Sequence, residues 1–274
     1  EHLRFLYHHY SLELHHLTKK KCLVVGLGNS QSTPDSLGPK VAGGILVTRY
    51  LFEMEKVQVE ENFSNVASIT PGVSGTTGIE SSDILHGIIH QIHPDYVIAI
   101  DALASSSIDR MNRTIQMTDT GIHPGSGVGN KRKEISEETV HIPVIAIGIP
   151  TVIDGVTIVS DTIQYMLQQF SYHKENIGKS SWKLAPVTNQ NYLNQEKELT
   201  QEEKEQLLGM VGGLSEEEMK SLIFEVLTPI GYNLMVTVKE MDFITEKLAS
   251  VLIHVINRVL HGKDFSQDKN MKKI

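Results

Sequence analysis

Two aspartates stand where apolar strands of the chain are expected to end. Asp35 follows the apolar run of residues 22–27 and a tight turn, and Asp101 directly follows the apolar run of residues 97–100. Because the carboxyl ends of parallel strands meet at one edge of a sheet, we expect the two side chains to face each other. Two close carboxylates share one proton, so that one accepts a proton from water while the other donates one. The spacing therefore predicts an acid and base pair.

A structural role is the alternative for each aspartate. An aspartate after a strand often caps the following helix, and this is the competing interpretation of Asp35. It is harder to apply to Asp101, because a carboxylate at the end of so apolar a run is costly unless it is paired or faces a cleft.

A histidine in a glycine-rich loop is the candidate third group. His123 lies in the loop of residues 119–130, and two carboxylates with one imidazole suit a divalent transition metal. Local hydrogen bonding is its alternative role. No lysine follows the loop glycines in the manner of a phosphate-binding loop, and Gly26 and Gly28 do not extend to a dinucleotide fingerprint. We therefore expect no cofactor other than this candidate divalent metal.

Size and charge narrow the classes of protein. The 274 residues suffice for one large α/β domain with an appendage. The net charge of −8 argues against sequence-independent binding to nucleic acid. Cys22, the single cysteine, is expected to be a small buried hydrophobe in a reducing, intracellular setting. No apolar span approaches the roughly 20 residues of a membrane-spanning helix, so we expect no membrane partner.

Alternating strands and helices are expected to position the two aspartates. This alternation is typical of an α/β fold with a mainly parallel, doubly wound sheet. The predicted strands are residues 22–27, 66–69, 96–101, 114–117 and 142–148, and the predicted helices are residues 1–21, about 37–54, 79–92 and 157–170.

Composition divides the chain into three parts. Residues 1–171 are expected to form the α/β catalytic core with its N-terminal helix, residues 172–199 a polar connecting loop, and residues 200–274 a helical C-terminal extension packed on the core. In the extension, Thr200 and Ser215 each precede a run of glutamates and are predicted helix starts.

Five long motifs closely resemble those of the germination protease family of spore-forming bacteria. They occur in the family's order and span roughly residues 24–170, with a looser likeness in the tail. The family's two acids fall on Asp35 and Asp101. The motifs are GLGNSQSTPDSLGP (26–39), SITPGVSGTTGIESSDI (68–84), YVIAIDALA (96–104), DTGIHPGSGVGNKRKEIS (119–136) and IPVIAIGIPTVID (142–154).

The resemblance implies an aspartic-type endopeptidase with Asp35 and Asp101 as catalytic residues. Its implied substrates are small acid-soluble spore proteins, whose degradation it would initiate during spore germination. It further implies a fold similar to the hydrogenase maturation proteases, synthesis as a zymogen, assembly into a homotetramer, and a location in the cytoplasm of the spore core.

Two alternatives stay open beside this expectation. In the related maturation proteases the corresponding acids bind a metal together with a histidine, so one alternative is a metal-dependent processing hydrolase of that type with His123 as third ligand. Family members also carry a sizeable region before the first strand, where this chain has about 20 residues. The other alternative is therefore an inactive truncated homologue.

Overall fold

The structure is a computed structural model that describes two compact units of the chain. The predicted helix over residues 1–21 lies outside the described residues, apart from its last two. The first unit comprises Glu1–Ala104, Asn112–Thr151 and Thr237–Ile274, and the second comprises Ser105–Met111 and Val152–Val236. Within them, the described residues are 20–54, 58–59, 63–125, 133–178, 198–227 and 234–262.

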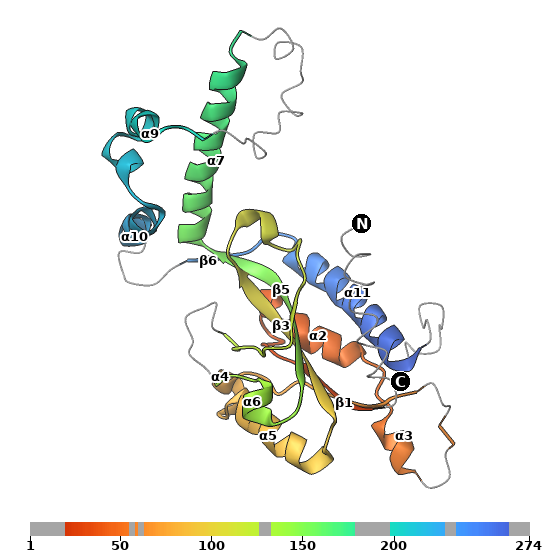
Figure 1. The fold of residues 1–274 in the computed structure, drawn as a ribbon. Coiled ribbons are helices and arrows are strands. Elements are labelled where there is room, and N and C mark those ends of the chain that lie inside the picture. The colour runs from red at the N-terminus through yellow and green to blue at the C-terminus, as the bar shows by residue number, and fades with distance from the viewer. Residues whose placement is uncertain are drawn as a thin grey trace. The chain divides into compact units, whose positions relative to one another are not determined.

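A mostly parallel sheet forms the centre of the first unit (Figure 1). Its strand order is β2-β1-β3-β5-β4. β1 (Lys21–Gly26) lies between β2 (Asn65–Ile69) and β3 (Tyr96–Ser105) and runs parallel to both. The edge strand β4 (Gln116–Thr118) is antiparallel to β5 (Val144–Asp154). The predicted α/β class with a mainly parallel sheet is thus confirmed, with an antiparallel strand added at one edge.

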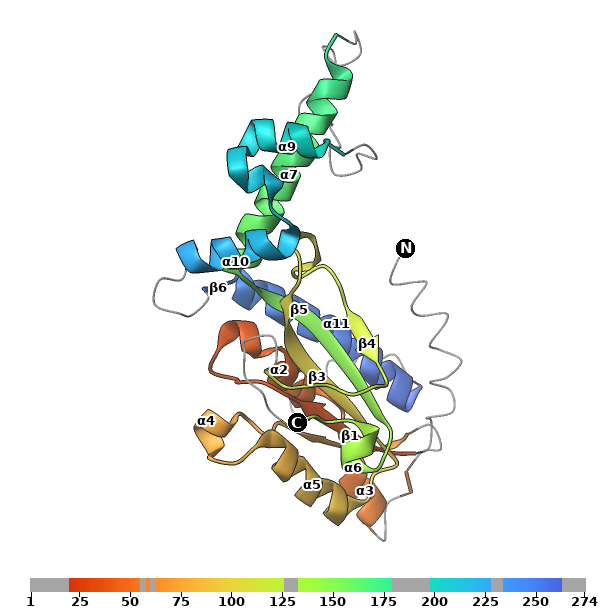
Figure 2. The same cartoon turned by 60° about the vertical axis from the view of Figure 1, so that its left-hand side comes forward.

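Helices cover both faces of this sheet (Figure 2). On one face, α2 (Leu37–Gly44) and α11 (Met241–His261) pack against alternate strand residues such as Val24. On the other face, α5 (Ser81–Ile92) packs against the intervening residues such as Val25. Because both faces are buried, the central strands have continuous apolar sequences rather than alternating ones.

The single helix predicted over residues 37–54 is in fact two. α2 ends at Gly44, and α3 (Arg49–Glu53) begins after a short break. A Cβ at Gly44 would lie 2.3 Å from the Ile253 side chain of α11, so any other residue type here would require Ile253 to shift. The Leu46 amide donates to Asn257 Oδ1 at 2.9 Å, which replaces a helical hydrogen bond.

The second unit is mostly helical. α7 (Gly155–Asn176) packs against α10 (Glu216–Leu227), and between them lies a small apolar cluster of Val156, Met219 and Ile223 with their neighbours. α9 (Gln201–Leu208) is joined to α7 by an ion pair between Glu203 and Lys174. No helix in the described ranges is long and apolar enough to cross a membrane.

Both predicted helix starts in the tail are confirmed. The Glu203 amide donates to Thr200 Oγ1, and the Thr200 amide donates to the Glu203 carboxylate. Ser215 and Glu218 exchange the same pair of hydrogen bonds before α10. Each start is therefore a capping box, in which two free amides are satisfied within four residues.

The boundaries of the two compact units differ from the predicted boundaries at residues 171 and 199. α7 was expected in the 1–171 core, but it belongs to the second unit and extends to Asn176. α11 was expected to pack on the core as part of the C-terminal extension, and it does so by supplying Leu252, Ile256 and Leu260 to the core of the first unit. Most of the predicted 172–199 loop, residues 179–197, lies outside the described residues.

Candidate active site at the end of the first strand

A tight turn after β1 positions Asp35. Gly28 has a φ of +110°, and a Cβ there would lie 2.2 Å from the Asp35 carbonyl oxygen, so both backbone conformation and space require glycine. The Asn29 amide donates to Asp35 Oδ2 at 2.8 Å and also approaches the Asp35 carbonyl oxygen at 3.1 Å. Asp35 ends a short 3₁₀-helix, η2 (Thr33–Asp35), and is half-buried. The carboxylate is thereby held in a defined orientation.

The start of α2 packs closely against the residue after β1 and against the middle of β3. A Cβ at Gly38 would lie 2.2 Å from the Leu27 carbonyl oxygen and 2.5 Å from that of Ile100. A Cβ at Gly26 would lie 2.1 Å from the Gly38 carbonyl oxygen. The Leu27 amide donates to the Ile100 carbonyl oxygen at 2.8 Å. Helix, β1 and β3 therefore meet backbone to backbone, which only glycines allow.

Asp101 lies where β3 loses its pairing with β1. The last paired residues are Gly26 and Ile100, so Asp101 is the first residue beyond the pairing. The chain turns away after β1 at Gly28, whereas β3 continues to Ser105. The predicted end of this strand at residue 101 was therefore too early. The Asp101 side chain is buried, with the residue 4% exposed, and its Oδ1 accepts the Ala102 amide at 2.9 Å.

These contacts place both aspartates at the same edge of the sheet. Ile100, next to Asp101, contacts Gly38 through its carbonyl oxygen, and Gly38 is three residues after Asp35. Both residues thus lie near the point where the pairing of β1 with β3 ends, and that their side chains face each other stays a prediction. That the two carboxylates share a proton stays a prediction.

His123 lies on a separate loop of the first unit. A bridge between Ile122 and Ile135 holds this loop, and His123 Nε2 lies 3.6 Å from Glu134 Oε2. The His123 side chain is 58% exposed. Across the part of the chain that the structure describes, no three His, Cys, Asp or Glu side chains gather into a group that could hold a metal ion. The described residues therefore do not join His123 and the aspartates in one such group, and residues 126–132 of the loop lie outside them.

Sequence reasoning assigned no role to Asn29 or Gly38. Asn29 orients Asp35 through its amide, and Gly38 lets α2 approach both strands. A signal was present for Gly38, since glycine at the second position of a helix costs stability and so indicates close packing. No comparable signal marks Asn29, because any residue except proline could supply its amide.

Cys22 is a structural residue. It is 2% exposed in the core, and burial raises the pKa of its thiol to about 12, partly offset by a hydrogen bond with Tyr96. A thiol that stays protonated at neutral pH is a poor nucleophile. This agrees with the expectation of a small buried hydrophobe.

Comparison with known proteins identifies close relatives in sequence. A family model described as germination protease matches residues 5–272. A germination protease from Geobacillus sp. is 52% identical over 247 residues, which cover 89% of this chain and 66% of that protein. One from Bacillus cereus is 52% identical over 259 residues, covering 92% of this chain and 70% of that protein. The chain thus spans about two thirds of the length of these relatives.

Two solved structures align with part of the chain. A NiFe hydrogenase maturation protease from Thermococcus kodakarensis is 19% identical, with a TM-score of 0.32, covering 48% of this chain and 75% of that one. A hydrogenase maturating endopeptidase from E. coli is 14% identical, with a TM-score of 0.25, covering 48% of this chain and 74% of that one.

Proposed function

The chain belongs to the germination protease family, and from this premise we propose that it is an endopeptidase that initiates degradation of small acid-soluble spore proteins during spore germination. Asp35 and Asp101 are the proposed catalytic pair. The observation that supports this assignment is the close backbone approach of Gly38 to Leu27, just after β1, and to Ile100 in β3, because Ile100 precedes Asp101 and Gly38 follows the Asp35 turn.

The proposed reaction is direct attack of water on a peptide bond. The ionised carboxylate of the pair accepts a proton from water as the water oxygen bonds to the carbonyl carbon. The protonated carboxyl then gives its proton to the peptide nitrogen as the C–N bond breaks. The products are a carboxylic acid and an amine, and the pair again holds one proton. No covalent bond to the enzyme forms.

Replacing either aspartate by asparagine tests this mechanism. Asp35→Asn and Asp101→Asn should each reduce cleavage of a purified small acid-soluble spore protein by about 100-fold to 10 000-fold, the range for loss of a general acid or base. The matched control is Asp119→Asn, which changes an exposed loop carboxylate of the same unit and should leave the rate unchanged. Thermal unfolding should show that all three variants fold. Full activity in either variant of the pair would refute the mechanism.

A chelator separates the aspartic mechanism from the metal-dependent alternative. If the pair acts without a metal, a chelator and His123→Ala should both leave the cleavage rate unchanged. Loss of activity in both experiments, restored by a divalent metal in the first, would instead support the processing hydrolase with His123 as a ligand.

The remaining parts of the proposal rest on family membership alone. We propose synthesis as a zymogen, a homotetramer, and activity in the cytoplasm of the spore core. Sedimentation velocity of the purified chain measures the assembly state, and mass spectrometry before and after the onset of activity detects processing. An inactive homologue would fold normally and cleave no spore protein under any of these conditions.

A further inference from the structure

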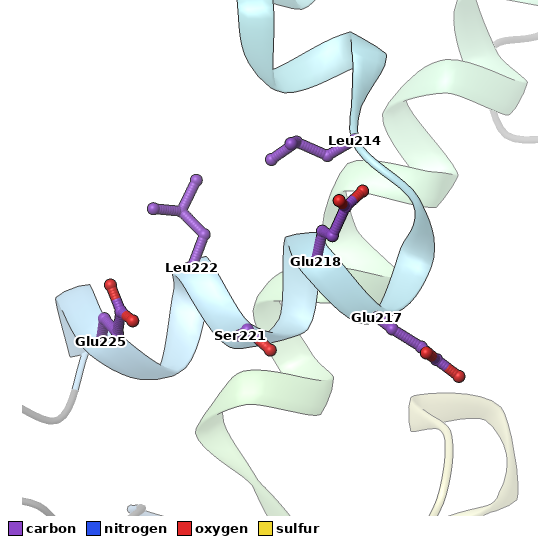
Figure 3. Close-up of a pocket in the computed structure, with 6 residues that line it drawn as sticks. All are labelled: Leu214, Glu217, Glu218, Ser221, Leu222 and Glu225. Carbon is purple, nitrogen blue, oxygen red and sulfur yellow. The ribbon is translucent and has the colours of Figure 1, made fainter.

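An open groove runs along the outer side of α10 in the second unit (Figure 3). Its volume is about 550 Å³, and most of it is open to solvent. None of the predicted site residues lines it. The lining residues are Leu214, Glu217, Glu218, Ser221, Leu222 and Glu225.

The groove has an apolar floor beside carboxylates. Met219 and Ile223 are buried toward α7, whereas Leu222 is 37% exposed on the other side of α10. Leu214, Glu218 and Leu222 extend to the same side of the helix, while Glu217 points away (Figure 3). Glu225 lies at the far end, one turn beyond Leu222.

The surrounding charge is strongly negative. Residues 198–227 contain eight glutamates and two lysines. Both lysines already lie in ion pairs, Lys204 with Glu198 at 3.7 Å and Lys220 with Glu216 at 2.5 Å. Hydrogen bonds from Ser215 lower the pKa of Glu218, so this carboxylate is ionised at neutral pH. The groove therefore presents leucine side chains within a negative field.

We propose that this groove docks a basic amphipathic helix of a partner protein. Glu218 and Glu225 are seven residues apart, which is two helical turns or about 10 Å along α10. A partner helix lying along α10 matches this spacing with lysine or arginine residues seven positions apart and an apolar side chain between them on Leu214 and Leu222. A second copy of the same surface fits poorly, because glutamates would face glutamates.

The test uses the full chain and three synthetic peptides of equal length. One is an amphipathic helix with leucine on one face and lysine beside it, the second replaces its lysines by glutamates, and the third scrambles the first. Fluorescence anisotropy should show binding of the first peptide only, and binding should weaken as salt screens the charges. Leu222→Ser should weaken binding roughly tenfold, and Glu225→Gln about threefold.

Glu202→Gln is the matched control, because Glu202 is an exposed glutamate of α9 that does not line the groove. It should leave the affinity unchanged, and hydrogen exchange of α10 should show that all variants fold. Three outcomes would overturn the proposal: equal binding of the scrambled peptide, equal weakening by Glu202→Gln, or no effect of Leu222→Ser. Each would show that the surface attracts basic chains without recognising a helix. Absence of any binding would also overturn the proposal.

Discussion

The contacts within the first unit differ in kind from the contacts within the second. In the first, contacts join residues far apart in sequence, such as the hydrogen bond of the Leu46 amide to Asn257 across 211 positions. In the second, α9 and α10 each begin with a capping box that spans four residues. The first unit carries the two aspartates, and the second carries the acidic groove.

This difference indicates what each candidate site requires. The aspartates depend on three chain segments that meet backbone to backbone, so their geometry is only as precise as that packing. The groove needs one helix with an exposed face, which local interactions suffice to form. A change to long-range packing should therefore affect catalysis, and a change to a cap should not.

The largest expected effect comes from one added methyl group. Gly38→Ala should destabilise the first unit by more than about 3 kcal/mol, because its Cβ would overlap two backbone oxygens that cannot move independently. Gly43→Ala, in the same helix, is the matched control: no atom lies within 4 Å of its Cβ, and alanine should stabilise α2 by about 0.5–1 kcal/mol.

Denaturant unfolding measures both changes, and the cleavage assay reports the site. We expect Gly38→Ala to lose activity and Gly43→Ala to keep it. Equal stability of the two variants would contradict the backbone contact on which the site depends.

A smaller effect is expected from pH acting on α11. His261 is fully buried, its Nε2–H donates to the Leu46 carbonyl oxygen at 3.0 Å, and burial lowers the pKa of its imidazole. Because the unfolded chain binds the proton more readily, the free energy of unfolding should fall as pH drops below about 6.5, by at most about 1.4 kcal/mol per pH unit from this group.

His261→Gln provides the comparison, since glutamine does not titrate. The slope of unfolding free energy against pH should become shallower below pH 6.5 in this variant. An unchanged slope would show that His261 does not carry the dependence. Hydrogen exchange should locate the wild-type change in the first unit and leave α9 and α10 unaffected.

The smallest expected effect is loss of a cap in the second unit. Thr200→Ala should destabilise α9 by about 1 kcal/mol, because the Glu203 amide loses its acceptor. Thr162→Ala in α7 is the control, as its hydroxyl only adds a bond to the already bonded Ile158 carbonyl. Hydrogen exchange of α9 measures both, and cleavage should not change. Reduced cleavage in Thr200→Ala would show that the units do not act independently.

Local patterns predicted the elements best where neighbouring residues decide them. The apolar runs of β1 and β5 and the capped starts at Thr200 and Ser215 were found from sequence. The break after Gly44 was not predicted from sequence. The side chains that contact the chain there, Ile253 and Asn257, lie more than 200 positions away. The sequence did predict that the C-terminal helix packs on the core, as α11 does, but it did not show that α7 belongs to the second unit.

By itself, the sequence determined that Asp35 follows the first strand and that Asp101 follows the apolar residues of β3, that the sheet is mainly parallel, and which family the motifs resemble. These properties follow from residue type and from spacing along the chain. Only the tertiary structure decided that Gly26, Gly28 and Gly38 let the segments meet and that His123 lies beside Glu134. Two backbones can approach closely only where no side-chain atom lies between them. Which glycines allow this is known only once it is known which segments pack together.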